Sequence, residues 1–477
     1  MMSTEFPLRQ ALEIGALDAH DQAALVRDGQ LSTVELTAAA IARAEHFASL
    51  GALSHTDFTA ALARAEGVDR SQPMAGVPWL PKDSLAYRDM PTRGGSRSRT
   101  SIPSATNSPY AQRFDDAGLV AIGKSTMPEF GLIGSTEPLL GPVTRNPWNL
   151  AHSPGGSSGG AGAALAAGIV PLAHGSDGAG SIRIPASACG VVGLKPGRGS
   201  TVRVRDRHAI EDLIVADSLM ARSVRDVAWA FAAAQPTSAA AVSLAAPSRR
   251  LRIGLIAPNL KEQRPHAEVE RVLQQSARLC DQLGHRVEPV DYPFDCPGVW
   301  QALHTLWSRL GLDAVQEVSA ARGAAFAERA LEPWTWGLAR YHLERCGVPE
   351  LEQAYDVLAQ LPTAFNEFHR HYDVLLTPTL SAPPPPLGVM APDQNFETLL
   401  EAMFDWISYT PLQNLAGTPA ISLPLGQADG LPIGVQFAAD RGQEPLLLQL
   451  AAELEHAAPW RGHWPAASVV TALQEMH

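Results

Sequence analysis

The chain has 477 residues, of which 45% are hydrophobic and 18% are charged. This balance is typical of a folded globular protein and excludes an intrinsically disordered chain. The 37 basic and 49 acidic side chains give a net charge of −12, which disfavours nucleic acid and anionic membrane surfaces as partners and favours a small molecule.

The cysteines favour a reducing compartment, and the apolar segments argue against secretion and against a membrane span. Cys189, Cys280, Cys296 and Cys346 are widely spaced and match no metal-ligand pattern, so we expect buried free thiols and no metal. The first twenty residues lack the apolar run of a signal peptide. The most apolar window, residues 161–173, is too short to span a bilayer. We therefore expect a cytoplasmic protein that does not bind membranes.

The first half of the chain predicts helices followed by buried strands. Asp18 begins an amphipathic stretch through Val26, and residues 32–35 form a Ser-Thr-Val-Glu capping box, so the first fifty residues predict two helices. From 74 to 199, short apolar runs alternate with Gly, Ser and Pro clusters, as in buried strands joined by functional loops. The predicted strands here are residues 77–80, 119–122 and 169–174.

The second half predicts a further α/β unit and then a helical segment. A strand at 250–256, a helix at 265–283 and a strand at 286–290 follow one another. Residues 297–370 have a helical pattern, and residues 373–376 predict a buried strand before a proline-rich loop.

Two motifs match known sites but lack the sequence context that those sites need. Residues 118–125 fit the phosphate-binding pattern G-x-x-x-x-G-K-S/T, with Lys124 as its lysine. The four residues between the glycines are themselves strand-like, which argues against a phosphate cradle. Residues 155–159 fit the G-x-S-x-G elbow of α/β-hydrolases with Ser157 as nucleophile, but a loop sequence stands where the elbow requires a strand.

A third pattern joins Ser157 to Ser181. An Ala/Gly-rich helix opens at residues 157–160 and should end near Gly168. A ten-residue helix travels about 15 Å and the strand 169–174 returns roughly 20 Å in the opposite sense. The tight loop at 175–181 would then bring two hydroxyls together beside backbone N–H groups, which are the components of an oxyanion hole.

Three side chains are candidates for the base of such a site. His152 lies in a loop before the glycines, and His174 ends the buried strand. Lys82 ends the apolar run at 77–80, where desolvation favours a neutral amine. Lys82 is therefore the preferred base.

Several blocks of sequence, in a consistent order, carry a family resemblance. They are residues 76–83, 155–160 (Gly-Gly-Ser-Ser-Gly-Gly), 175–186, 193–196 (Gly-Leu-Lys-Pro), 222–226, 417–420 and 434–436. Together they resemble the amidase signature family, with coverage to about residue 440 and the weakest likeness between 240 and 370. The segment 173–199 is most similar to the branch of 6-aminohexanoate cyclic-dimer hydrolases.

The resemblance implies a Ser-Ser-Lys catalytic set. Ser181 would be the nucleophile, Ser157 the bridging serine after a cis peptide bond, and Lys82 the base that starts a proton relay. The family also implies oxyanion-hole N–H groups and supporting residues, and no cofactor. The oxyanion-hole residues are Gly178, Ala179, Gly180 and Ser181, and the supporting residues are Ser158 and the expected ion pair of Asp177 with Arg183.

Two residues depart from the family pattern. Ala179 stands where glycine is common, which excludes backbone angles that only glycine reaches easily. Pro81 stands directly before Lys82 and removes a ladder donor, so we expect that strand to end at an edge or a bulge.

The resemblance implies an α/β fold, a large mixed β-sheet core sandwiched between α-helical layers. The expected segments are 1–60 (N-terminal helices packing on the core), 61–240 (core with the catalytic residues), 241–370 (variable α/β and helical cover) and 371–477 (C-terminal return to the sheet).

The expected activity is hydrolysis of the C–N bond of a small-molecule carboxamide through an acyl-enzyme. Three alternatives remain: a glutamine-hydrolysing subunit of an amidotransferase complex, an α/β-hydrolase-type esterase using Ser157, and a nucleotide-binding protein using 118–125. The acyl and amine parts of the substrate and the oligomeric state, a homodimer included, stay open.

Overall fold

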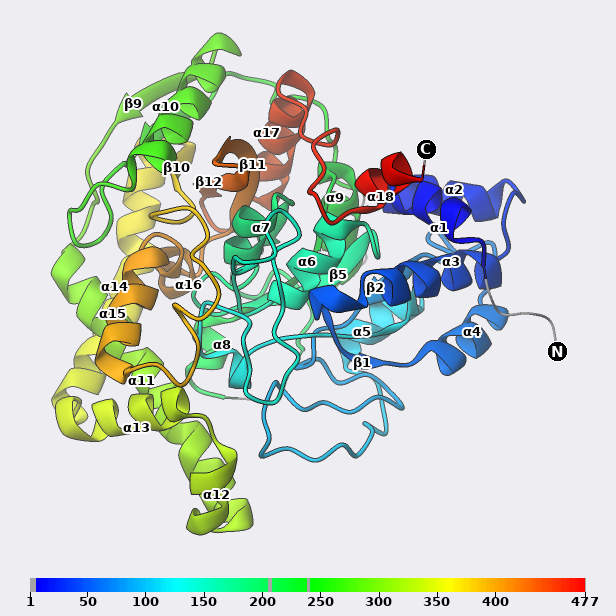
Figure 1. Cartoon of the computed structure of the whole chain (residues 1–477). Helices are drawn as coiled ribbons and strands as arrows, with labels where there is room; N and C mark the ends of the chain where they lie inside the picture. The colour runs from blue at the N-terminus through cyan, green and yellow to red at the C-terminus, as the bar shows by residue number, and fades with distance from the viewer. Residues whose placement is uncertain (1–5, 205–207, 238–240, 477) are drawn as a thin grey trace.

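Helices cover both faces of a mixed β-sheet in the computed structural model, which describes residues 6–204, 208–237 and 241–476 (Figure 1). The strands are β1 (Leu53–Thr56), β2 (Pro78–Leu80), β3 (Val120–Ala121), β4 (Gly123–Ser125), β5 (Leu172–Asp177), β6 (Gly193–Lys195), β7 (Ala216–Ala221), β8 (Arg252–Leu255), β9 (Arg286–Pro289), β10 (Val374–Pro378), β11 (Ala420–Ala428) and β12 (Leu431–Ala439).

The helices fall into three stretches of the chain. The N-terminal and core helices are α1 (Leu8–Gly15), α2 (Ala19–Arg27), α3 (Thr33–His46), α4 (Phe58–Glu66), α5 (Pro109–Asp115), α6 (Gly159–Ala167), α7 (Arg183–Cys189), α8 (Glu211–Ile214) and α9 (Val224–Ala234). The middle helices are α10 (Ala267–Gln282), α11 (Cys296–Arg322), α12 (Ala324–Ala330), α13 (Pro333–Arg345) and α14 (Val348–His371). The last are α15 (Phe396–Trp406), α16 (Pro411–Ala416), α17 (Glu444–Ala457) and α18 (Val469–Glu475).

Two groups of strands join into one sheet. Their orders are β3-β2-β5-β7 and β6-β11-β12-β10-β8-β9, while β1 and β4 pair separately. Val192 and Ala221 exchange backbone hydrogen bonds, which link the end of β7 to the start of β6. β2 runs parallel to β3 and β5, whereas β5 and β7 are antiparallel. The predicted large mixed β-sheet is confirmed.

Alternate strand residues enter hydrophobic clusters on opposite faces of this sheet. On β10, Val374 and Leu376 belong to one cluster and Leu375 to another. On β5, Leu172 and Ala173 divide in the same way. Because successive strand side chains point to opposite faces, the first cluster fills one face, under α9, α10 and α17. Two further clusters share the other face, under α6 at one end and α11 and α14 at the other. The predicted helical layers are therefore confirmed.

The strand that leads to Ser181 is displaced from its predicted position. β5 spans Leu172–Asp177, so residues 175–177, predicted as loop, belong to the strand. Pro171 lacks an amide hydrogen and cannot join the ladder, so the strand begins after it. The turn before α7 is consequently confined to residues 178–182.

The N-terminal helices follow their sequence signals. Asp18 caps α2 by accepting from the Asp21 N–H, and both bonds of the Ser32–Glu35 capping box are present at α3. α1 was not predicted. It has no side-chain cap, so no start signal marks it among the neighbouring residues.

Residues 118–125 form two short strands, β3 and β4, rather than a phosphate loop. Lys124 is fully buried, and its Nζ donates to the Leu85 carbonyl at 2.5 Å. A cradle of convergent N–H groups at a helix start is therefore missing from this described segment, and the nucleotide-binding alternative is wrong.

Of the two expectations for Pro81, an edge is wrong and a bulge is confirmed. β2 lies inside the sheet between β3 and β5, not at an edge. Trp79 pairs with Ala121 but Lys82 pairs with Ser125, so the partner strand has one extra residue across Pro81.

All four cysteines are buried and unpaired, as expected. None of the described helices combines the length and the apolar character needed to cross a membrane. In the part of the chain that the structure describes, no cluster of three or more His, Cys, Asp or Glu side chains could hold a metal ion.

Candidate active site

The Lys82 side chain lies at the centre of the candidate site. It follows β2 and is fully buried. Its Nζ lies 2.8 Å from the Ser157 hydroxyl and 2.9 Å from both the Ser158 and the Ser176 hydroxyls. Lys82 thus contacts both serines of the Gly-Gly-Ser-Ser-Gly-Gly block, Ser157 and Ser158, and it also contacts Ser176.

Ser157 lies in the loop before α6, and the Gly156–Ser157 peptide bond is cis, as the family resemblance implied. No strand directly precedes it, so the α/β-hydrolase elbow alternative is wrong. The loop is tightly enclosed. A Cβ on Gly131, whose φ is +73°, would lie 3.0 Å from the Ser157 hydroxyl oxygen. Gly131 therefore needs both the left-handed conformation and the space that glycine provides.

Ser181 lies in the turn between β5 and α7. It lines the same cavity of about 260 Å³ as Ser157 and Ser176. Among the described residues, no hydrogen bond joins the hydroxyls of Ser157 and Ser181. The structure therefore brings Lys82 and Ser157 into contact and places Ser181 on the wall of the same cavity.

The backbone N–H groups of the 178–181 turn differ in their partners. The Gly180 N–H donates to Asp177 Oδ1 at 2.7 Å. The N–H groups of Gly178, Ala179 and Ser181 meet no acceptor in the described part of the chain. Three of the four predicted oxyanion-hole donors thus have no acceptor among the described residues, and of these three Gly178 and Ser181 line the cavity; the fourth already has an acceptor.

The glycine-specific backbone angle of this turn falls at residue 180. Gly180 has φ +129°, and a Cβ there would lie 2.2 Å from Thr410 Oγ1. Ala179 is outside the residues with positive φ, and its carbonyl accepts from the Thr410 hydroxyl at 2.6 Å. Alanine at 179 therefore causes no backbone strain.

A buried ion pair holds the turn, as expected for Asp177 and Arg183. Arg183 Nε and Nη2 donate to the two Asp177 carboxylate oxygens at 2.9 and 2.8 Å. Burial by itself raises the pKa of Asp177, but the Arg183 guanidinium outweighs it and holds the pKa at about 2. The Asp177 carboxyl is therefore ionised at neutral pH.

Four contributors were missed as site residues from the sequence. The missed residues are Ser176, Thr410, Asn414 and Gln436. Arg183 donates to Asn414 Oδ1 at 2.6 Å and to Gln436 Oε1 at 2.7 Å. Gln436 lies in one of the blocks that resemble the family, and Ser176 lies in another. Thr410 and Asn414 lie in or beside α16, which had no motif to mark it.

Neither alternative histidine base lines this cavity. The His174 side chain is fully buried on β5, and its Nε2 lies 3.1 Å from Asp217 Oδ1. His152 pairs with Pro386 in an isolated bridge. Lys82 is the only one of the three proposed bases that contacts a candidate catalytic hydroxyl among the described residues.

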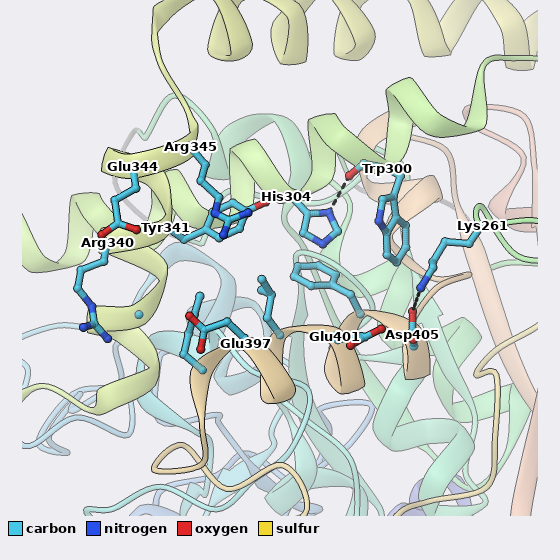
Figure 2. Close-up of a pocket in the computed structure, with 14 residues that line it drawn as sticks. Lys261, Trp300, His304, Arg340, Tyr341, Glu344, Arg345, Glu397, Glu401 and Asp405 are labelled. Carbon is cyan, nitrogen blue, oxygen red and sulfur yellow. Dashed lines mark hydrogen bonds and ion pairs between the residues drawn. The ribbon is translucent and has the colours of Figure 1, made fainter.

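A second cavity, of about 360 Å³, lies between α11, α13 and α15. Figure 2 shows Trp300 and His304 on one side of it and Glu397 on another. Lys82, Ser157 and Ser181 do not line it. α11 borders both cavities, because Trp307 of the same helix lines the one that contains the serines.

Comparison with known proteins shows the family of this chain. A family model described as "Amidase" matches residues 35–448. The chain belongs to the amidase signature family. This amidase is therefore a hydrolase that acts on carbon–nitrogen bonds other than peptide bonds.

Curated relatives match this amidase over nearly their whole length. A protein of Mycobacterium bovis named "Putative amidase AmiC" is 39% identical and covers 95% of this chain and 97% of that protein. The 6-aminohexanoate-cyclic-dimer hydrolase of Paenarthrobacter ureafaciens is 34% identical, covering 94% and 96%. An acylamidase of Rhodococcus erythropolis is 31% identical, covering 96% and 98%.

Solved structures share the fold. A 6-aminohexanoate cyclic dimer hydrolase complexed with substrate has a TM-score of 0.86 at 30% identity and covers 95% of this chain and 99% of that one. A bacterial aryl acylamidase of the amidase signature enzymes has a TM-score of 0.83 at 26% identity, covering 93% and 96%.

Proposed function

We propose that this amidase cleaves a small-molecule carboxamide through an acyl-enzyme on Ser181, with Ser157 as the bridging serine and Lys82 as the base. The observation that carries the proposal is the 2.8 Å contact between Lys82 Nζ and the Ser157 hydroxyl, on the wall of the cavity that Ser181 also lines. A cytoplasmic location fits the four unpaired cysteines.

The proton moves along a chain of three groups. Neutral Lys82 accepts the proton of Ser157, Ser157 accepts that of Ser181, and Ser181 Oγ attacks the amide carbonyl. Burial among hydroxyls and without bulk water favours the uncharged amine that this step requires. The proton then returns along the chain to the leaving nitrogen as the C–N bond breaks, and water hydrolyses the ester in the same way.

The negative charge that develops on the carbonyl oxygen needs donors already in place. The N–H groups of Gly178, Ala179 and Ser181 supply them in this proposal, and Gly180 instead fixes the turn through Asp177. Each such donor is typically worth about 3 kcal/mol of barrier. The Asp177–Arg183 pair and Ser158 are positioning residues, since they hold the turn and the Lys82 amine.

Active-site variants test the assignment. Ser181→Ala should abolish both turnover and covalent labelling by a fluorophosphonate probe, while Lys82→Ala and Ser157→Ala should each lower kcat by about three orders of magnitude or more. Lys261→Ala, which lies outside the catalytic cavity, is the control. Labelling of Ser157 in place of Ser181 would overturn the assignment.

The pH dependence tests the base separately. Because the relay requires uncharged Lys82, kcat/KM should fall toward acid pH as the amine becomes protonated. A flat profile from about pH 5 to about pH 9 would contradict a lysine base. Release of ammonia from glutamine, together with a stoichiometric partner protein, would instead favour the amidotransferase alternative.

A further inference from the structure

The Trp307 ring forms part of the wall of the catalytic cavity beside the nucleophile turn, residues 178–182. It lines the cavity together with Ser181 and Gly178. A Cβ on Gly178 would lie 3.6 Å from Cζ3 and 3.7 Å from Cη2 of the ring, so the gap between the turn and the six-membered edge of the indole is about one methyl group wide. A group bonded to Ser181 enters the cavity that this ring also lines.

The orientation of that ring is fixed by a hydrogen bond. Trp307 Nε1 donates to the Leu132 carbonyl at 2.9 Å. Trp334 Nε1 donates to the same carbonyl, also at 2.9 Å. Leu132 lines the catalytic cavity and Trp334 does not. One acceptor thus holds two indoles, of which only Trp307 can touch a bound substrate.

Next to Trp307 the cavity wall is apolar at two positions of α11. Leu310 lies three residues after Trp307 and Ala314 four residues after Leu310, so the three side chains share one face of the helix and line the same cavity. Phe130 and Leu132 add apolar surface from the loop across the cavity. The charged lining residues of α11 lie further along the helix: Asp313 is about 9 Å along the axis from Trp307, and Glu317 is roughly 15 Å from it.

We propose that Trp307 determines which amides this enzyme accepts: it limits the size of an apolar acyl group next to Ser181. This inference rests on the proposed function. The acyl group remains bonded to Ser181 while the amine leaves and water enters. The carbonyl oxygen stays among the N–H groups of the 178–181 turn throughout both steps of the proposed reaction, and Trp307 lies beside Gly178 of that turn, so we assign this wall to the acyl part.

Alkyl phosphonofluoridates test the size limit directly. Each reagent bonds to Ser181 with loss of fluoride, so the leaving group is constant, and the alkyl group on phosphorus takes the place of the acyl group of a substrate. The second-order rate constant of Ser181 labelling is measured with methyl, butyl and octyl members. Wild type should label faster with methyl than with octyl. Trp307→Leu should raise the octyl-to-methyl ratio at least about tenfold, the range in which one or two methylenes discriminate in an apolar pocket.

Two further variants separate pocket shape from loop position. Trp307→Phe and Trp334→Phe each remove one hydrogen bond to Leu132 but keep an aromatic ring. The ratio should change less than about threefold in Trp334→Phe, whereas Trp307→Phe, whose shorter ring withdraws the edge nearest Gly178, should raise it in the same direction as Trp307→Leu. A circular dichroism melt of each variant shows that it is folded.

The outcomes distinguish this inference from the proposed function. If no member labels Ser181 in wild type, the proposed function fails. If labelling occurs but Trp307→Leu slows all members equally, or if Trp334→Phe shifts the ratio as much, Trp307 only positions the 130–132 loop and the inference is overturned.

Discussion

At the scale of single residues, the nucleophile turn depends on one buried charge pair. Asp177 and Arg183 are both fully buried. Among the described residues, the guanidinium otherwise donates to neutral oxygens, which belong to the Thr410 carbonyl, Asn414 and Gln436. Removing the carboxylate charge would leave a cation in the core with no anion beside it. Such an uncompensated charge is costly because the interior solvates it poorly.

Asp177→Asn should therefore lower the free energy of unfolding by about 3–5 kcal/mol, measured by urea denaturation at pH 7. Asp405→Asn is the matched control, since it breaks the Lys261–Asp405 pair, whose side chains are 28% and 37% exposed. That change should cost less than about 1 kcal/mol. Equal midpoints for the two variants would contradict the role of Asp177.

At the scale of secondary-structure elements, two glutamates join the helical cover to the wall of the cavity. Glu129 directly precedes Phe130, and its carboxylate accepts from the Glu332 N–H at 2.8 Å and from the Thr335 hydroxyl at 2.7 Å. Its other oxygen accepts from Ser96 at 2.6 Å. Glu332, directly before α13, accepts from the Leu139 N–H at 2.6 Å. α13 is thereby tied to the loop that lines the site.

Replacement by glutamine should have opposite effects on stability at the two positions, Glu332 and Glu129. Burial, and then the nearby Glu129 charge, raise the pKa of Glu332 to about 8. The pKa of this carboxyl in the unfolded chain is about 4.3, so between about pH 4.3 and about pH 8 the folded chain keeps a proton on Glu332 that the unfolded chain has lost. The free energy of unfolding therefore decreases as pH rises through this range. Glu332→Gln should remove that decrease and raise the urea midpoint at pH 8, with little difference at pH 5.

Glu129→Gln is the matched variant for this prediction. Both carboxylate oxygens of Glu129 already accept hydrogen bonds, so an amide NH₂ would face a donor. The expected loss is about 1–3 kcal/mol at either pH. A stabilising effect of Glu129→Gln, or a pH-independent effect of Glu332→Gln, would contradict this account.

The same elements show what the sequence could predict. The cap at Ser32 marks α3, because caps are read from neighbouring residues. β5 was misplaced by three residues because Pro171 prevents pairing that the apolar run alone would favour. Lys82, Ser157 and Ser181 came from short motifs and a family resemblance. The contacts of Arg183 with Asn414 and Gln436 were not predicted, because these residues lie on α16 and β12, more than 200 residues away in the chain. The segment boundaries at 60, 240 and 370 stay a prediction.

At the scale of the whole molecule, the two ends of the chain are held together around Asp18. Its carboxylate accepts from Arg225 Nε at 2.6 Å and from Arg461 Nη2 at 2.8 Å. α18 packs on α1 near the same end (Figure 1). This cluster joins α2, α9 and the C-terminal segment, and none of its residues lines the catalytic cavity.

A double-mutant cycle measures how much this connection contributes. Asp18→Asn removes the charge but keeps a residue that caps α2 well, and Arg461→Ala removes one partner. Because Asp18 is buried and shares two guanidiniums, the coupling energy from urea denaturation should be about 1 kcal/mol. The exposed Arg9–Glu13 pair, at 57% and 54% side-chain exposure, should give a coupling below about 0.5 kcal/mol. kcat/KM should stay at the wild-type value in every folded variant. A loss of turnover, or equal coupling energies in the two cycles, would contradict a purely stabilising role of the contacts around Asp18.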